Sequence, residues 1–377
     1  MKPDGLKDKT LALFFTCGIS LKIWHDIGMI DREVALYKAL SKNFNHIYLF
    51  TWGGQEDLRF QEYLANNITI VPKKYVTNSL LYSLALPFVH RKILKHVDII
   101  KTNQMYGSWS AALAKLLYRN MLVVRTGYTW SLFFRMENTK GWRSLVSKTA
   151  ERFAYRMADA AITSSWNDYN YVEQRYHPHN HIHGHNYVDT ELFKPINGIE
   201  KKKDAICFIG RLNQQKNLNA LFDALKGLSS TLDIIGSGPQ LAQLKELARH
   251  NNVKVNFLGN IPNSELPAIL NKYELFVLTS LWEGMPKTLL EAMACGLPVV
   301  GTNVDGIKEV IRDGDNGILC DTTAGSIRQA IIKAMNDRDL REKLGAGARN
   351  TIKQSFSLDK LLQKELDLYS RILDKHD

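Results

Sequence analysis

The strongest constraint on the fold is a regular alternation of two kinds of segment. Short apolar runs with the composition of buried strands alternate with longer amphipathic stretches that have helical periodicity. In the first half the predicted strands are residues 11–16, 46–52, 68–72, 97–103, 121–127 and 160–165, and helices are expected at 31–42, 107–118 and 143–158. This alternation is typical of an α/β protein with a parallel sheet covered by helices.

The same rhythm starts again in the second half of the chain. The predicted strands there are residues 205–211, 231–238, 253–259, 275–280, 297–303 and 316–321. Between the two series, residues 186–205 contain Pro195, Gly198 and a run of lysines that interrupt the pattern. We therefore expect two Rossmann-like domains in tandem, the first covering residues 1–187 and the second 188–356.

Composition places the chain among soluble globular proteins. With 377 residues, 45% of them hydrophobic, it is long enough for two cores. No apolar run approaches the roughly 18 residues of a membrane span, and the polar first ten residues lack a cleavage-site pattern. The four cysteines lie far apart in apolar runs, so we expect reduced, buried thiols in a cytoplasmic protein.

Positive charge is concentrated in the first half. Residues 1–187 contain 24 Lys and Arg against 14 Asp and Glu, which gives +10 of the total formal charge of +11. An anionic membrane, a phosphorylated substrate or a nucleic acid would each suit such a surface, and a basic surface that only confers solubility is the alternative.

The segment "SLWEGMPKTLLEAMACGLPVV" (280–300) sets two carboxylates around a predicted helix start. Pro286 suits the first turn, and Gly296 is expected to end a helix over 287–295. First-turn amides, at Lys287, Thr288 and Leu289, would be open to an anion such as a diphosphate. The carboxylates Glu283 and Glu291 would then accept hydrogen bonds from sugar and ribose hydroxyls. The alternative is that both are ordinary solvated acids.

Two further loops of the second half have suitable chemistry. In "FIGRLNQQKNL" (208–218), Gly210 ends a strand, and Arg211 and Lys216 would bring two cations to a diphosphate. In "DIIGSGPQLAQLKELA" (233–248), the turn at Gly238 would let a base or ribose approach the backbone. Leu241 stands where a dinucleotide-binding fingerprint would have its third glycine, which argues against a NAD site.

Taken together, these segments resemble a known family. "GRLNQQKNL", "IIGSGP", "VNFLGNI", "SLWEGMPKTLLEAMACGLPVVGTNVDGIKEVI" and "DGDNGILC" occur in the order and spacing of the nucleotide-sugar-binding half of the family 4 retaining glycosyltransferases. The resemblance is strong from about residue 186 to 350. It implies the GT-B fold, two Rossmann-like domains facing a central cleft, with a last helix at 357–373 that crosses back to the N-terminal domain.

The resemblance also implies roles for individual residues. Arg211 and Lys216 would bind the donor diphosphate, Glu283 the donor sugar and Glu291 the ribose. Backbone at Gly284, Met285 and Thr288 would line the sugar and phosphates, and Asn260 and Ile261 would border the base. No metal or other cofactor is implied.

The first half departs from the pattern of the family. Instead of a Gly-Gly-x-Glu loop the chain has "HDIGMIDREVALYKAL" (25–40), with Gly28 and Glu33 as partial matches. The strand ends that often carry a histidine read "VVRTGYTW" (123–130) and "DIIKTNQ" (98–104). Asn103, Arg125 and Tyr128 are therefore hypothetical acceptor-site residues, with a structural role as the alternative.

Two more stretches allow two interpretations each. In "HPHNHIHGH" (177–185), strand alternation would place His177, His181 and His185 on one face as a metal site, but we favour a polar strand and loop. The stretch "SLLYSLALPFVHRKILKHVD" (79–98) is apolar and then basic. It would suit an element resting on an anionic bilayer or, alternatively, a buried helix.

Together with these residues, the resemblance implies a retaining, hexosyltransferase-type enzyme that moves a sugar from a UDP- or GDP-linked donor to a glycan or lipid-linked acceptor. Cell-surface polysaccharide or glycolipid synthesis would be its setting, with a cytoplasmic location that includes the cytoplasmic membrane face. The alternatives are an epimerase or hydrolase of the same fold, or a non-catalytic binder of nucleotide sugars. Nucleic acid is not expected as a partner.

Overall fold

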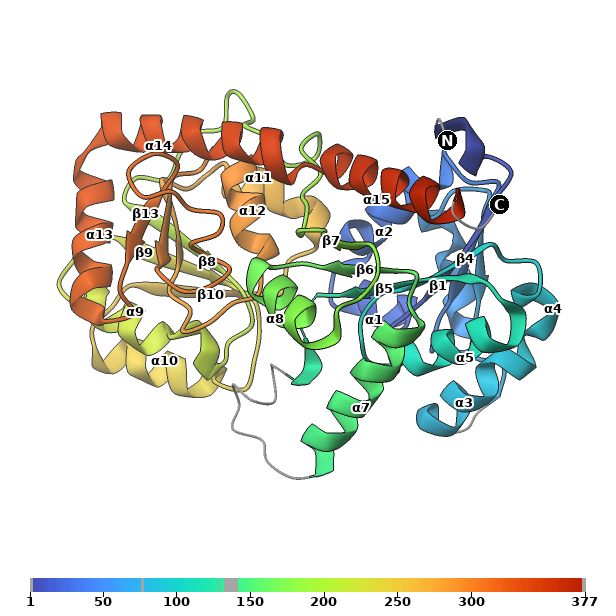
Figure 1. Ribbon diagram of the computed structural model, residues 1–377. Helices are drawn as coiled ribbons and strands as arrows, with labels where there is room; N and C mark the ends of the chain where they lie inside the picture. Colours follow the sequence, from blue (N-terminus) through green and yellow to red (C-terminus); the bar gives the residue numbers. More distant parts are fainter. Residues whose placement is uncertain (1–2, 76–77, 128, 132–141, 375–377) are drawn as a thin grey trace. The chain divides into compact units, whose positions relative to one another are not determined.

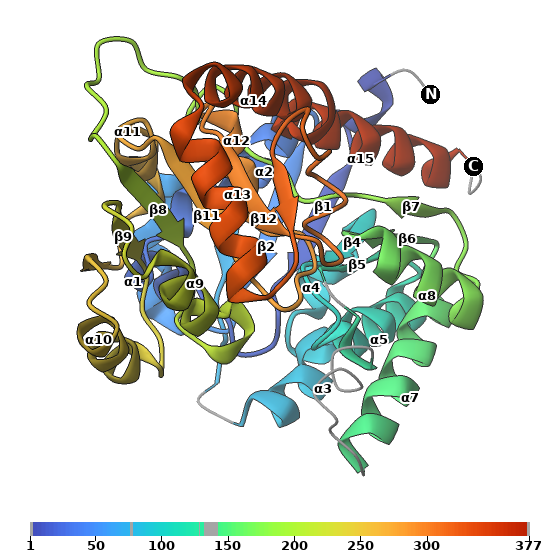
Figure 2. The same ribbon diagram turned by 90° about the vertical axis from the view of Figure 1, so that its left-hand side faces the viewer.

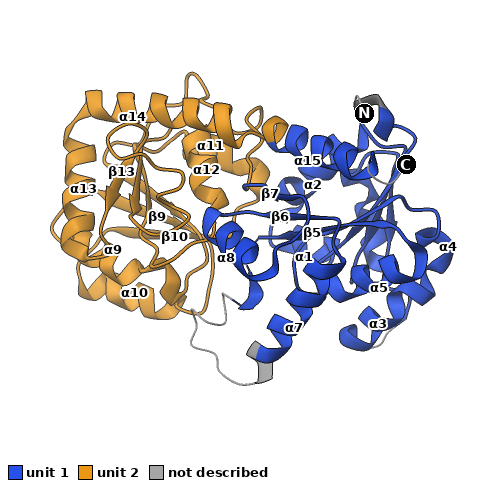
Figure 3. Ribbon diagram, viewed as in Figure 1, with its two compact units in different colours: residues 1–185, 361–377 blue, residues 186–360 orange. Residues whose placement is uncertain are grey.

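The computed structural model describes residues 3–75, 78–127, 129–131 and 142–374 (Figure 1). By its internal contacts the chain divides into two units (Figure 3). Unit 1 contains residues 1–185 and 361–377, and unit 2 contains residues 186–360. The C-terminal helix α15 (Leu358–Leu373) thus begins in unit 2 and continues in unit 1.

Unit 1 is built on a seven-stranded parallel sheet with the order β3-β2-β1-β4-β5-β6-β7. Its strands are β1 (Thr10–Phe14), β2 (His46–Phe50), β3 (Ile68–Val71), β4 (Ile99–Thr102), β5 (Met121–Thr126), β6 (Ala160–Thr163) and β7 (His181–His183). The central strands are buried along their whole length, as expected for a parallel sheet covered on both faces.

Helices cover both faces of this sheet. In the two views, α2 and α15 lie on one face, and α3, α5 and α7 on the other (Figures 1 and 2). Alternate residues of β4 follow this division, because Ile100 packs in the core beneath α5 and α7 while Lys101 contacts α15. The helical segments are η1 (Pro3–Leu6), α1 (Leu21–Asp26), α2 (Ile30–Ser41), η2 (Gln55–Tyr63), α3 (Ser79–Val89), α4 (Arg91–Leu94), α5 (Ser108–Tyr118), α7 (Trp142–Met157) and α8 (Trp166–Tyr176).

Unit 2 contains a six-stranded parallel sheet with the order β10-β9-β8-β11-β12-β13. Its strands are β8 (Ala205–Ile209), β9 (Thr231–Ile235), β10 (Val255–Gly259), β11 (Leu275–Leu278), β12 (Val299–Thr302) and β13 (Ile318–Cys320). The helical segments are η3 (Gln214–Lys216), α9 (Leu218–Leu225), α10 (Leu241–His250), η4 (Asn263–Glu265), α11 (Leu266–Leu270), α12 (Lys287–Ala294), α13 (Ala324–Asn336), α14 (Arg338–Thr351) and η5 (Ile352–Phe356).

Both sheets have the doubly wound order in which the chain first builds outward in one direction and then returns to the centre. The order reverses between β1 and β4 in unit 1, and between β8 and β11 in unit 2. Loops at the carboxyl ends of two such strands diverge, and this switch point is where open α/β sheets bind ligands. In unit 2 the loops concerned are residues 210–217 and 279–286.

The predicted elements are confirmed with small shifts at their ends. Every predicted strand overlaps an observed one, the helix expected at 287–295 is α12, and that expected at 357–373 is α15. All four cysteines are buried and have free thiols. Within the described ranges, no helix combines the length and apolarity needed to cross a bilayer.

Candidate functional site

The switch point of unit 2 brings together two of the predicted site residues. The Lys216 ammonium, at the end of η3, forms an ion pair with Oε1 of Glu283, which follows β11. Their side chains are 13% and 9% exposed, so the pair is largely shielded from water. Ser280 Oγ also donates to Glu283 Oε1 at 2.6 Å. The carboxylate is therefore held at the carboxyl edge of the sheet by a cation and a hydroxyl.

The two loops that carry this pair are also joined by hydrogen bonds to backbone carbonyls. Leu281 N donates to Gln215 O at 2.8 Å, and Gln215 Nε2 donates to Trp282 O at 2.8 Å. Thr279 Oγ1 donates to Lys216 O at 3.0 Å. These contacts fix Lys216 against Glu283 before any ligand arrives, which is the pre-organisation that binding sites need. Sequence reasoning missed Gln215 and Ser280, although both stand within three residues of predicted site residues.

Helix α12 begins directly after this pair. Pro286 is its N-cap and provides no side-chain hydrogen bond to the first turn. Leu289 N already donates to Pro286 O at 3.2 Å, so the expectation that the Leu289 amide is open was wrong, because the first turn is tight. The helix start nevertheless presents the positive end of its dipole beside Lys216 and Glu283. Gly296, at φ +70°, ends the helix as predicted.

Glu291, the second predicted carboxylate, is almost completely buried, with 1% of its surface exposed. Its Oε1 accepts a hydrogen bond of 2.9 Å from Asn263 Nδ2 in η4. Asn263 follows the predicted base-contacting residues Asn260, which is exposed, and Ile261, which is half-buried. The expected alternative of a solvated helix residue is wrong for Glu291. Asn263 was missed, because nothing in the local sequence indicates a partner 28 residues away.

Glycines let the loops of this edge approach one another closely. A Cβ on Gly238 would lie 2.3 Å from Leu212 O, and one on Gly236 would lie 2.0 Å from Gly210 O. The space beside Gly238 is thus filled by the loop after β8, which accounts for this glycine without a ligand. In the same way, a Cβ on Gly306 would lie 2.0 Å from Gly284 O.

The remaining predicted residues of unit 2 lie on the same two loops as the ion pair or at the start of α12. Gly210 lies next to Lys216, since a Cβ there would be 3.4 Å from Lys216 Cε. Arg211 is exposed, and among the described residues its guanidinium makes no hydrogen bond or ion pair. Met285 is buried in the core, and its carbonyl accepts a 2.7 Å hydrogen bond from Asn186 Nδ2. Thr288 is half-buried in the first turn of α12.

The candidate acceptor residues of unit 1 have structural contacts of their own. Gly28 follows α1 at φ +70° and its N–H donates to His25 O, as expected of a residue that ends a helix. Asn103 Oδ1 accepts from Tyr37 Oη at 3.2 Å, and Asn103 O accepts from Arg125 Nη1 at 3.2 Å. Asn103 and Arg125 thus lie together at the ends of β4 and β5, whereas Tyr128 lies outside the described residues.

The histidine-rich stretch does not form the face considered from alternation. Helix α8 ends at Tyr176 and His177 adopts a left-handed conformation, so only His181–His183 form the edge strand β7. His181 stacks on Tyr169, and its Nδ1 lies 2.7 Å from Glu173 Oε2. Among the residues that the structure describes, no cluster of three or more His, Cys, Asp or Glu could hold a metal ion. The alternative of a shared strand face is therefore wrong, and the favoured strand and loop agrees with the structure.

Two family models match the chain. Residues 189–351 match the model of glycosyl transferases group 1, and residues 34–192 match that of glycosyltransferase family 4. The two matches together extend over most of both units.

Among curated proteins, the chain is 28% identical over 239 residues to an N-acetyl-alpha-D-glucosaminyl L-malate synthase of Bacillus anthracis, covering 59% of this chain and 62% of that protein. It is 30% identical over 203 residues to the UDP-Gal:alpha-D-GlcNAc-diphosphoundecaprenol alpha-1,3-galactosyltransferase of Escherichia coli, covering 49% of this chain and 52% of the relative. The matched part is thus less than two thirds of either relative.

Solved structures share the fold at low sequence identity. Sucrose-phosphate synthase from Thermosynechococcus elongatus has a TM-score of 0.79 at 18% identity. The match covers 97% of this chain and 100% of that protein's chain. Anabaena Alr3699/HepE, solved in complex with UDP and glucose, has a TM-score of 0.77 at 18% identity. The match covers 96% of this chain and 99% of that protein's chain. The chain therefore belongs to the group 1, or family 4, glycosyltransferases and has their GT-B fold.

Proposed function

We propose that this protein is a retaining glycosyltransferase that transfers a hexose from a nucleotide-diphosphate donor to a glycan or lipid-linked acceptor. The observation that carries the proposal is the Lys216–Glu283 ion pair at the switch point of unit 2, beside the start of α12. It combines a cation and a helix N-terminus for phosphate with a carboxylate for sugar hydroxyls.

Each residue of this edge then has a role in the transfer. Lys216 turns from Glu283 to the donor diphosphate, and the exposed Arg211 adds a second cation. A sugar hydroxyl takes the place of Lys216 as a donor to Glu283. As the bond between the sugar and the diphosphate breaks, Lys216, Arg211 and the α12 dipole stabilise the departing phosphate oxygen.

The nucleoside end of the donor would lie farther along the same edge. Glu291, held by Asn263, accepts hydrogen bonds from the ribose, and Asn260 and Ile261 border the base. The acceptor hydroxyl attacks from the side on which the phosphate leaves, so that configuration is retained. No side chain of this chain is assigned as a nucleophile, and no metal ion is required for the proposed roles.

We propose UDP or GDP as the nucleotide and a step of polysaccharide or glycolipid synthesis as the setting, at the cytoplasmic face of a membrane. In support, HepE was solved in complex with UDP and glucose, and the Escherichia coli relative is named for a UDP-galactose donor and a diphosphoundecaprenol acceptor. Nucleic acid is not proposed as a partner.

Thermal shift with UDP, GDP, ADP and their sugar conjugates tests the donor site, since a ligand that binds only the folded state raises its melting temperature. We expect one nucleotide to stabilise the wild type and not Lys216→Met, while the exposed Lys333→Met serves as the matched control. If the stabilising sugar nucleotide is then consumed only with an acceptor, transfer is supported. Turnover without acceptor would favour an epimerase or hydrolase, and binding without any turnover would favour a non-catalytic binder.

A further inference from the structure

Helix α3 of unit 1 has an apolar exposed side, unlike an ordinary surface helix. Its exposed residues form one stripe, at positions i, i+1, i+4, i+5 and i+8, in which every member is apolar. They are Leu80, Leu81, Leu84, Ala85 and Phe88. Leu81 is 66% exposed and Phe88 is 56% exposed. The alternative in which residues 79–98 form a buried helix is therefore wrong.

Polar groups of α3 point inward instead. Ser83 is fully buried, and its Oγ accepts a 2.7 Å hydrogen bond from Trp109 Nε1 of α5. Ser110 Oγ donates to Ser83 O at 2.6 Å. Tyr82 is also buried, and its hydroxyl lies 2.7 Å from His90 Nε2. These bonds fix the rotation of the helix, so that Leu80, Leu81 and Leu84 face outward while Leu86 packs in the core.

Two neighbouring helices also expose large apolar side chains. Helix α5 packs between α3 and α7, and the three lie side by side on one face of the unit 1 sheet in both views (Figures 1 and 2). Helix α5 exposes Leu116 and Leu117, and α7 exposes Leu145, Val146 and Phe153. We call the exposed apolar side chains of α3, α5 and α7 the three-helix face. Exposed apolar side chains that gather on three adjacent helices are typical of an interaction site, whereas apolar residues exposed singly need no explanation.

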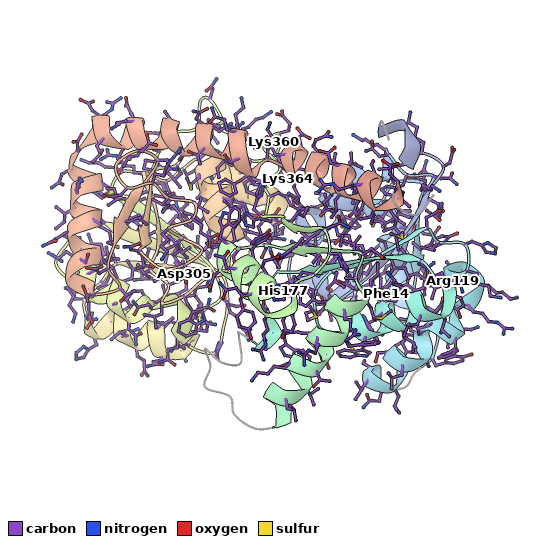
Figure 4. The ribbon with its side chains drawn as sticks, in the orientation of Figure 1. Phe14, Arg119, His177, Asp305, Lys360 and Lys364 are labelled. Atoms are coloured by element: carbon purple, nitrogen blue, oxygen red, sulfur yellow. The ribbon has the colours of Figure 1, made fainter. Side chains whose placement is uncertain are left out.

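Within the described residues 79–119 and 145–157, the exposed side chains that carry charge at neutral pH are all cations. They lie on α4 and just after it, on α7, and at the end of α5, where Arg119 is labelled in Figure 4. The set comprises Arg91, Lys92, Lys95, Arg119, Lys148, Arg152 and Arg156. Between residues 73 and 136 the sequence contains a single acid, Asp98, and its carboxylate lies 3.5 Å from Lys9 Nζ. The two acids nearest α7 are also engaged, since Glu151 is buried and Asp159 pairs with Lys115.

We propose that the three-helix face docks onto an anionic lipid bilayer. Exposed Leu and Phe interleaved with Lys and Arg are the composition of interfacial helices, which place apolar side chains among the acyl chains and cations at the headgroups. This inference deepens the proposed function. It rests on that function only for the purpose of the docking, since a docked enzyme would meet a lipid-linked acceptor at the membrane surface.

Vesicle flotation tests the proposal with the full-length chain. The probes are vesicles of phosphatidylcholine alone and of equal parts phosphatidylcholine and phosphatidylglycerol. We expect the wild type to bind the mixed vesicles, and to bind them less at high salt.

The double variant Leu81→Glu/Leu145→Glu should lose at least about ten-fold in partitioning, because two leucines no longer enter the bilayer. Lys92→Gln and Lys95→Gln should each lose about five-fold. Leu58→Glu, on η2 against α1 and α2, is the matched exposed control.

Any one of three results would overturn the proposal. The first is that the wild type binds neither kind of vesicle, and the second is that the leucine variants bind vesicles as well as Leu58→Glu does. The third is that sedimentation reveals a dimer that Leu81→Glu separates, while the wild type binds no lipid. The last result would assign the face to a second copy of the chain. Thermal shift with the donor nucleotide is measured on the same variants. A retained shift with no flotation would refute only the docking, whereas flotation without any nucleotide shift would refute only the donor site.

Discussion

Lys101 and Glu365 form a buried ion pair across 264 residues of sequence. Lys101 Nζ lies 2.7 Å and 2.5 Å from the two carboxylate oxygens of Glu365, and the side chains are 1% and 0% exposed. Tyr369 Oη adds a 2.5 Å hydrogen bond to Glu365 Oε2. Burial lowers the pKa of Lys101, and the Glu365 charge opposes that shift. This pair attaches α15 to the central strand β4 of unit 1.

Breaking this pair from one side should destabilise unit 1 strongly. In Lys101→Met a buried carboxylate is left without its cation, which we expect to cost about 3–5 kcal/mol of unfolding free energy. Lys101→Met/Glu365→Gln should recover much of that loss, because the glutamine is neutral and still accepts from Tyr369. Calorimetry compares these variants with Lys226→Met, which breaks an exposed ion pair and should cost less than about 1 kcal/mol. Equal effects of Lys101→Met and Lys226→Met would contradict the prediction.

Two half-buried histidines should make unit 1 less stable in mild acid. Burial lowers the pKa of His90 and of His183 to about 4, from about 6.5 in the unfolded chain. Between these values the unfolded state binds more protons, so stability is full above the unfolded pKa and falls as the pH decreases. We expect each histidine to contribute about 1 kcal/mol of loss near pH 5, after allowance for partial exposure.

The melting temperature measured between about pH 7 and pH 5 checks this sign. His183→Phe keeps an aromatic ring against Trp166, whose ring centroid lies 4.3 Å away, and should flatten the slope. Replacement of the exposed His96 by glutamine leaves the half-buried rings of His90 and His183 in place and serves as the control. A slope unchanged in His183→Phe would show that its titration is not the cause.

The fold was predictable because its signals are local. The strands of a doubly buried parallel sheet are continuous apolar runs, and Pro286 and Gly296 mark the ends of α12. The histidine stretch shows where local patterns fail, since alternation assumes a strand and His177 instead adopts a left-handed conformation after α8. For residues 79–98 the sequence left an interfacial element and a buried helix as alternatives, and only the packing of α3 determines which of its side chains face outward.

The candidate site was predictable as a set of residues but not as a set of contacts. Glu283 and Lys216 were both identified, yet their ion pair depends on β8 and β11 being neighbours, which only the strand order determines. The Asn263–Glu291 bond depends in the same way on the packing of η4 against α12. Side-chain partners across a sheet edge are tertiary facts, and residue spacing along the chain does not contain them.

Substitutions of Lys216 and Glu283 should affect nucleotide binding and sugar binding differently. Lys216→Met removes the cation for the diphosphate, so the stabilisation by free nucleotide should disappear and kcat/KM should fall about 10²–10³-fold. Glu283→Gln keeps Lys216 and should retain the thermal shift with free nucleotide, while losing the additional shift that the sugar conjugate gives. Equal loss of both shifts in Glu283→Gln would mean that this carboxylate holds Lys216 in place rather than contacting sugar. The exposed Glu246→Gln is the control for charge removal in unit 2.

Glu291 should distinguish ribose from deoxyribose. A hydrogen bond to a charged group contributes about 1.5–3 kcal/mol, so the wild type should bind the stabilising nucleotide roughly ten-fold or more tightly than its 2′- or 3′-deoxy form. In Glu291→Gln the carboxylate charge is gone, so this preference should shrink to a few-fold. Asn263→Ala removes the 2.9 Å hydrogen bond that orients Glu291 and should cause a similar but smaller change. Calorimetric titration of both nucleotides into the three proteins measures the difference directly. An undiminished preference in Glu291→Gln would assign the ribose to another residue and leave Glu291 as a buried partner of Asn263.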